Sequence, residues 1–133
     1  MENNYLKNIF AFLVLSDKED RYEVHLVNQS ENTMYSRVEI LTGAFEGDLD
    51  GIVETSKVEK VYGALYPKSA ILLEADTLNW LDMTIWYHLD IYLGIEKLNK
   101  VWFDFRYPHN YDKEKVEIPY LGKMGVKIEL AKI

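Results

Sequence analysis

The sequence predicts an all-β protein, an antiparallel β-sandwich of about eight strands with one or two short helical turns. Three observations support this fold class. Apolar and polar residues alternate with a period of two in several short runs. Turn-forming residues separate these runs, and no helical run is long enough for the crossover that parallel strands require. Strand spacing suits a closed barrel as well, but we favour the sandwich.

The first expected strand is the apolar run IFAFLVL at residues 9–15. A signal peptide would have several basic residues before such a run, whereas only Lys7 precedes this one. A membrane span would need about 20 apolar residues. We therefore interpret the run as a buried strand.

Residues 21–28 and 33–41 form the next two expected strands, and the turn-rich NQSEN between them predicts a hairpin. Alternation places one apolar set toward the core: Tyr22, Val24, Leu26, Met34, Val38 and Ile40. The side chains expected to face outward are Arg21, Glu23, His25, Arg37 and Glu39.

The C-terminal half supplies the remaining elements. Residues 76–81 predict a helical turn capped by Asp76 or Thr77. Residues 108–124 predict a long loop with a short edge strand at 116–118. The strands expected here cover 57–66, 70–75, 84–94, 100–107 and 125–130.

The stretch EGDLDGIVETSK at residues 46–57 imitates a calcium-binding loop, because acidic residues and a glycine occupy several of its ligand and turn places. Such a loop needs a bidentate glutamate at its twelfth place and a helix on each side. Lys57 occupies that place, and the flanks predict strands or coil. We therefore interpret the stretch as a turn between strands, with Gly51 free to adopt positive φ.

Composition narrows the classes of function. The chain has 133 residues, which suits one domain over 1–133, and no cysteine, which fits a cytoplasmic location. Its net charge is −7, and its basic residues are scattered, so we expect neither direct nucleic-acid binding nor membrane association. Phosphate-binding, nucleophile-elbow and zinc-protease motifs are missing, and His25, His88 and His109 share no ligand spacing. We predict no enzyme activity, no cofactor and no metal site.

One face of the two strands at 84–94 and 100–107 forms the candidate binding surface. Their odd-numbered residues are apolar and predict the core side. The even-numbered residues then project away from the core: Trp86, His88, Asp90, Tyr92, Trp102, Asp104 and Arg106. Aromatic residues together with arginine are typical of binding surfaces.

The register of these two strands stays open at the level of sequence, because a hairpin through the loop 94–99 allows two favourable arrangements. One places His88 opposite Asp104 and Trp86 opposite Arg106. The other places Asp90 opposite Arg106. A third, with Asp90 opposite Asp104, is disfavoured by like charge.

Three stretches together resemble a known family: YEVHLVNQS (22–30), GALYPKSAILLEADTLNWLD (63–82) and KVWFDFRY (100–107). They are similar to the all-β domain attached to small MutS-related (Smr) proteins of Bacteroidetes. The resemblance implies a β-sandwich-like accessory domain with no established activity of its own. The nicking-endonuclease module of those proteins has no counterpart in this chain, and no functional residue is carried over.

These observations predict a non-catalytic interaction domain that binds a protein partner or self-associates. Two alternatives remain open. The aromatic face suits a carbohydrate or another small ligand, and a small acidic chain suits an immunity or antitoxin-type protein that blocks a basic toxin electrostatically.

Overall fold

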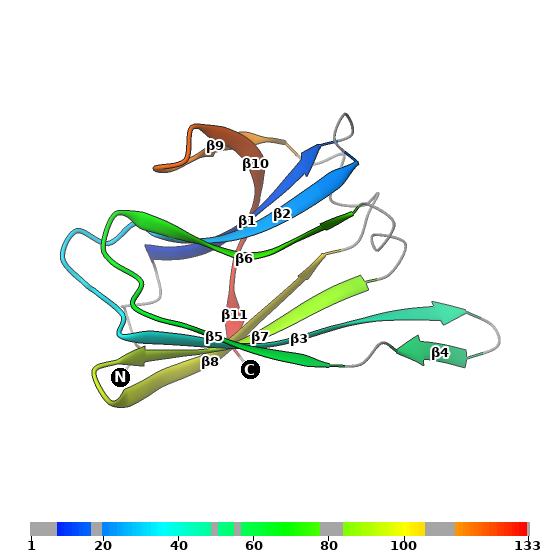
Figure 1. Cartoon of the computed structure of the whole chain (residues 1–133), viewed down its shortest axis with the longest axis horizontal. Helices are drawn as coiled ribbons and strands as arrows, with labels where there is room; N and C mark the ends of the chain where they lie inside the picture. The colour runs from blue at the N-terminus through cyan, green and yellow to red at the C-terminus, as the bar shows by residue number, and fades with distance from the viewer. Residues whose placement is uncertain are drawn as a thin grey trace.

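The computed structural model describes residues 8–16, 20–48, 51–54, 57–77, 84–105 and 114–132. These residues form two antiparallel sheets packed against each other (Figure 1), which confirms the all-β sandwich. The five-stranded sheet has the order β6 (Ser69–Thr77), β2 (Arg21–Asn28), β1 (Ile9–Ser16), β10 (Lys123–Ile128), β9 (Val116–Ile118). The six-stranded sheet has the order β11 (Ala131–Lys132), β8 (Glu96–Phe105), β7 (Thr84–Leu93), β3 (Arg37–Asp48), β4 (Gly51–Glu54), with β5 (Val58–Tyr62) also paired to β3.

The described residues contain eleven strands, so the expected number of about eight was too low. The additional strands include the short elements β4 and β11. Asp76 and Thr77, the expected helix caps, are instead the last residues of β6. The rest of the predicted helical turn lies outside the described residues.

The core between the sheets contains the apolar faces expected from alternation. Tyr22, Val24 and Leu26 of β2 are at most 2% exposed. One assignment was wrong, because Met34 is 44% exposed. His25 faces away from this core as expected, and it is nevertheless buried beside Glu23 of its own strand, 2.9 Å away.

The predicted hairpin between residues 21–28 and 33–41 was also wrong, because β2 and β3 belong to different sheets. The buried side chain of Asn28 organises the crossing between them. Its amide nitrogen donates to the carbonyl oxygens of Thr33 (2.9 Å), Tyr66 (3.1 Å) and Leu65 (3.3 Å). Its amide oxygen accepts from the backbone nitrogen and the hydroxyl of Ser30 at 3.0 and 2.6 Å. The polar residues that suggested a tight turn therefore form hydrogen bonds within a longer connection between the two sheets.

The run IFAFLVL is a buried strand, β1, as predicted. Both faces of this strand are apolar, because each face packs against other apolar residues. One face joins the core between the sheets. The other face forms a second apolar cluster, in which Phe12, Val27 and Ile118 are at most 2% exposed. Ile118 of the short strand β9 packs there, so the β9–β10 hairpin covers part of the outer side of this sheet.

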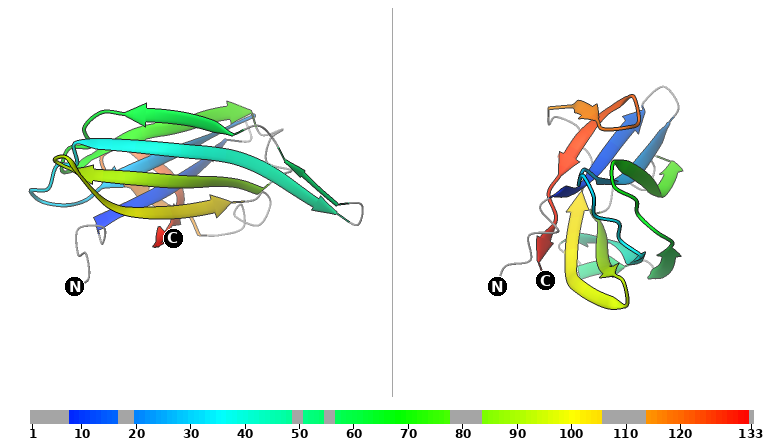
Figure 2. Two further views of the ribbon diagram at one scale, coloured as in Figure 1. Left: turned by 90° about the horizontal axis from the view of Figure 1, so that it is seen from below. Right: turned by 90° about the vertical axis from the view of Figure 1, so that its left-hand side faces the viewer.

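Within the stretch 46–57, residues 46–48 and 51–54 belong to a two-stranded ribbon formed by β3 and β4. Asp48 pairs with Gly51 across the turn, and both flanks are strands, so the turn between strands is confirmed. Figure 2 shows the far end of this ribbon extending past the neighbouring strands.

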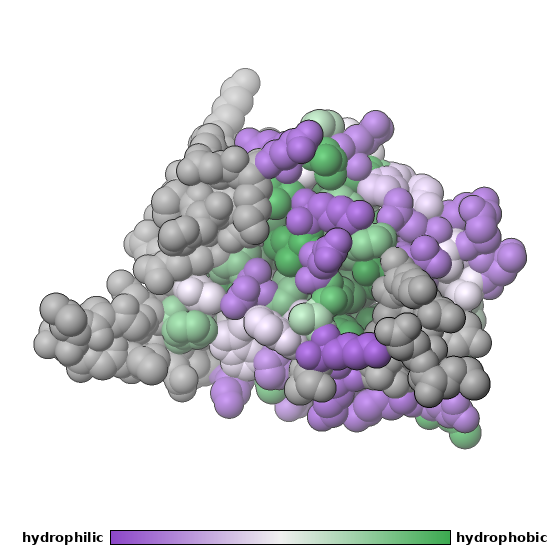
Figure 3. Space-filling view, turned by 180° about the vertical axis from the view of Figure 1, so that it is seen from behind, coloured by the Kyte–Doolittle hydropathy of each residue, from purple (hydrophilic) through white to green (hydrophobic). Residues whose placement is uncertain are grey.

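Seen from behind, on the side where β10 and β11 lie, apolar side chains gather at the centre with hydrophilic ones around them (Figure 3).

Candidate functional site

The candidate face lies on the six-stranded sheet, on the side turned away from the core, and is called the outer face below. The alternation predicted for β7 and β8 is confirmed. Tyr87, Leu89 and Phe103 of the inner side are at most 2% exposed, whereas Trp102 on the outer face is 37% exposed. Six of the seven predicted residues lie at outer positions of these two strands: Trp86, His88, Asp90, Tyr92, Trp102 and Asp104. Arg106, the seventh predicted residue, lies outside the described residues.

The register of β7 and β8 differs from both predicted arrangements. His88 lies opposite Trp102, Trp86 opposite Asp104, and Asp90 opposite Lys100. The cause is the turn, because Gly94 adopts φ 64° and β8 begins already at Glu96. The sequence analysis had assigned residues 94–99 to a longer loop. A bulge after Ile91 then shifts the pairing once more.

Trp86 is positioned by close contact with β3. Gly43 lies opposite it, and a β-carbon at Gly43 would come within 2.8 Å of the Trp86 ring. The Thr42 hydroxyl donates to the Trp86 carbonyl oxygen at 2.9 Å. On the solvent side, the ring of Trp86 lies 4.9 Å from the ring of His88, centroid to centroid, at an angle of 56°. The indole is therefore half-buried against the sheet.

Tyr92 occupies the other end of β7, between charged groups of both signs. The Arg37 guanidinium lies 5.5 Å from its ring centroid, and the Lys97 ammonium lies 5.8 Å from it. A hydrogen bond to the Glu39 carboxylate raises the pKa of Tyr92, because ionisation would place two negative charges together. Lys97 also pairs with Asp90 at 3.3 Å, and this contact raises the pKa of Lys97.

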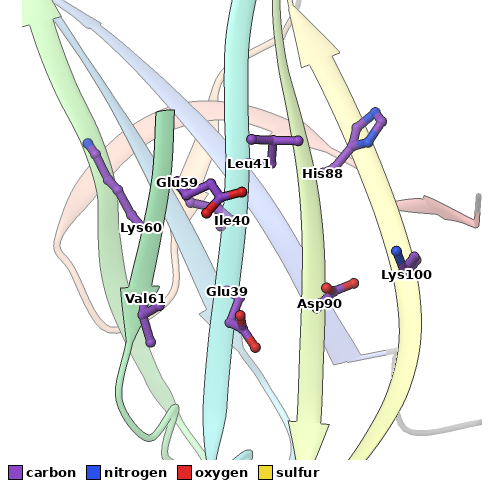
Figure 4. A pocket seen from close by; sticks show the side chains of 9 residues that line it. All are labelled: Glu39, Ile40, Leu41, Glu59, Lys60, Val61, His88, Asp90 and Lys100. Atoms are coloured by element: carbon purple, nitrogen blue, oxygen red, sulfur yellow. The ribbon is translucent and has the colours of Figure 1, made fainter. Parts of the chain in front are cut away.

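A shallow hollow of about 360 Å³ lies at the centre of the outer face, over β5, β3, β7 and β8 (Figure 4). Its carboxylates come from three neighbouring strands: Glu59 of β5, Glu39 of β3 and Asp90 of β7. Glu39 and Asp90 are direct cross-strand partners. Lys60 also borders the hollow, but its side chain points away from these carboxylates, and its ammonium lies 3.8 Å from Glu74.

A second hollow of about 490 Å³ lies where β8 meets β10 and the C-terminal residues. Trp102 contributes its aromatic side chain. The charged residues that border it are Asp104, Lys127 and Glu129. An aromatic ring beside charged groups suits a ligand with a flat apolar side and a polar rim.

Sequence reasoning missed the share of the outer face that β3 and β5 supply. Arg37 and Glu39 were assigned to the outward side of their strand, which the structure confirms. Their position beside β7 follows from the sheet order, for which the sequence carries no signal. The residues that β3 and β5 add to the face are Arg37, Glu39, Leu41, Glu59 and Val61.

Among the described residues, no group of three histidine, aspartate or glutamate side chains is arranged to hold a metal ion. None of the described helical residues belongs to a helix long and apolar enough to cross a membrane. No protein family model and no curated protein matches the sequence. The resemblance to the Smr-associated domain therefore stays a prediction.

Proposed function

We propose that this chain is a non-catalytic binding protein that contacts a protein partner, or a second copy of itself, through the outer face of the six-stranded sheet. The observation that carries this proposal is the exposure of Trp102 at 37% on a face that also holds Trp86 and Tyr92. The core of the sandwich lies on the opposite side, so burial in the core does not account for these side chains. Exposed aromatic residues beside charged ones are the usual anchors of protein interfaces.

The most strongly perturbed titratable groups lie inside the sandwich, and this location favours binding over catalysis. Catalytic residues with shifted pKa values usually meet in a cleft. Here burial, together with the nearby Glu74 carboxylate, raises the pKa values of Tyr22 and Tyr87 strongly. Both hydroxyls donate to Glu74 from inside the sandwich, at 3.3 and 2.6 Å. These contacts satisfy a carboxylate between the sheets and contribute to stability.

The test is to replace both tryptophans of the outer face, Trp86→Ala together with Trp102→Ala, and to include Trp102→Ala alone. Truncating an interface anchor typically weakens association by about 2 kcal/mol, or about thirtyfold. Self-association is measured by sedimentation velocity, and partner binding by affinity capture from the native host. Tyr66→Ala is the matched control, because Tyr66 is a 59% exposed aromatic residue outside this face.

The far-UV circular dichroism spectrum shows whether the variants remain folded. Association that is unchanged in a folded double variant contradicts the proposal. Unfolding of the single Trp102→Ala variant also contradicts it, because that side chain would then be part of the core.

The hollow beside Trp102 favours a second candidate, a carbohydrate-binding module. A sugar ring stacks its apolar side on an indole and directs its hydroxyl groups to charged neighbours such as Asp104 and Lys127. Titration with mono- and oligosaccharides should then shift the tryptophan fluorescence, and a glycan array should give a defined signal. If neither assay gives a binding signal, this candidate is excluded.

A further inference from the structure

The free edge of β8 is paired over only part of its length. β11 lies along this edge antiparallel to β8, with Ala131 opposite Trp102 and Lys132 opposite Val101. Just before β11, the chain comes from β10 in the other sheet (Figure 1). No other described strand lies beside residues 103–105 on this side. Every second residue of an edge strand directs its backbone N–H and C=O away from the sheet, so this part of β8 offers backbone groups to a further strand.

The described part of β8 lacks three features that commonly protect edge strands, namely a proline, a bulge near the free edge and a charge that points inward. Its pairing with β7 is regular from Phe105 to Asn99, and the bulge lies beyond, at the far end of the strand. The inward-facing residues here, Phe103 and Phe105, are apolar and 2% exposed. The edge beside residues 103–105 is therefore regular enough for a further strand to pair with it.

The second hollow, of about 490 Å³, lies at this edge. One wall consists of residues 102–104 of β8. The other wall belongs to the connection between β10 and β11, with Lys127, Ile128, Glu129 and Ala131. Ala131 carries only a methyl group, and Trp102 opposite it stays 37% exposed. A strand placed in the hollow would bring its own side chains onto this indole.

We propose that the edge of β8 beside residues 103–105 receives an extended segment of a protein partner as an additional antiparallel strand. The chain's own β11 binds the same edge in this way, which shows that an antiparallel strand fits there. In such strand addition, backbone hydrogen bonds supply affinity and side chains supply specificity. The partner residue opposite Asp104 lies on the outer face, diagonal to Trp102, where an aromatic side chain reaches the indole. This inference rests on the proposed function and gives the partner its form, an extended segment with an aromatic residue.

The probe is a blocked pentapeptide that alternates threonine with tyrosine, because both residues favour strands. Two matched peptides each carry one backbone N-methyl group, the first on the central threonine and the second on the tyrosine that follows it. Neighbouring N–H groups of an added strand point in opposite directions. One methyl group therefore removes a hydrogen bond to β8, whereas the other points to solvent.

Amide chemical shifts of the labelled protein are followed during titration with each peptide. We expect changes centred on residues 102–105 and 127–131, with a dissociation constant on the order of 1 mM for the unmodified peptide. One methylated peptide should bind about fivefold more weakly, because it loses one hydrogen bond. The other methylated peptide should bind as the unmodified one does.

Glu129→Trp is the blocking variant, because Glu129 is an exposed residue on the wall of the hollow and a larger side chain there fills the space. At the same peptide concentration it should abolish the shift changes at residues 103–105. Glu117→Trp, at an exposed position on β9 of the other sheet, is the matched control and should leave the titration unchanged. The far-UV circular dichroism spectrum shows that both variants remain folded.

Three results of the titration overturn the inference: equal binding of all three peptides, shift changes centred elsewhere, or changes that Glu129→Trp leaves unaltered. Shifts at residues 103–105 that depend on protein concentration without peptide also overturn it, because a second copy then occupies the edge.

Failure of the proposed function is distinguishable from failure of this inference. If Trp102→Ala weakens association while the peptide titration fails, the binding face stands without an added strand. If Trp102→Ala has no effect on association in a folded protein, the binding face itself is wrong.

Discussion

Replacement of Asn28 by alanine should destabilise the protein by about 3–5 kcal/mol, because this side chain of β2 binds the connections that precede β3 and β6. The change removes the two amide protons that three carbonyl oxygens share, which costs about 2 kcal/mol at about 1 kcal/mol for each proton. The three carbonyl oxygens each retain another donor. The buried backbone nitrogen of Ser30 loses its acceptor, and an unpaired buried donor costs about 1–3 kcal/mol.

Urea denaturation measures this effect, and a slope near 2 kcal/mol per molar urea would translate it into a midpoint about 2 M lower. Ser30→Ala keeps the backbone hydrogen bond to Asn28 and loses only its hydroxyl contacts, so it should cost about 1–2 kcal/mol. Asn32→Ala changes an exposed asparagine of the same loop and should stay within about 0.5 kcal/mol of the parent. If Asn28→Ala costs no more than Ser30→Ala, the crossing does not depend on this side chain.

Two further predictions concern the core. Tyr22 and Tyr87 ionise near pH 10 when unfolded and only at higher pH when folded, so their stabilising contribution is complete below pH 10 and is lost above it. Tyr22→Phe should remove about 1.4 kcal/mol per pH unit from the alkaline decline in unfolding free energy, and an unchanged slope in pH-dependent urea melts would refute the assignment. Gly125→Ala should cost about 1–3 kcal/mol in the same melts, because the new β-carbon would lie 2.9 Å from a backbone oxygen of β1. Gly63→Ala meets nothing within 4 Å and should be close to neutral, so equal effects at the two glycines would contradict the packing.

Local pattern accounts for the parts of the fold that the sequence predicted well. Alternation identified β2, β7 and β10 to within two residues at each end, and the short edge strand expected at 116–118 coincides with β9. The same period of two separated Tyr87 from His88, and so defined the outer face. Such features depend on residues that are neighbours in the chain, which a sequence shows directly.

The pairing of strands was harder to predict from the sequence, because it depends on turns and on contacts between residues that are distant in the chain. The register of β7 and β8 follows from a two-residue turn in which Gly94 adopts positive φ. The pattern GIEKLN did not reveal that turn. The connection from β2 to β3 is bound by Asn28, whose other bonding partners Leu65 and Tyr66 lie 37 and 38 residues away. Polar residues near a strand end indicate a turn equally well.

The outer faces of the two sheets differ in how far the chain covers them, and this difference favours the six-stranded sheet as the binding side. The outer side of the five-stranded sheet carries the apolar cluster of Phe12 and Val27, which Ile118 of the chain itself covers in part. The outer face of the other sheet keeps Trp102 exposed beside charged side chains. Substitutions at Phe12 should therefore reduce stability first, whereas substitutions at Trp102 should reduce association and leave the fold intact. A partner that contacted the five-stranded sheet would reverse this order.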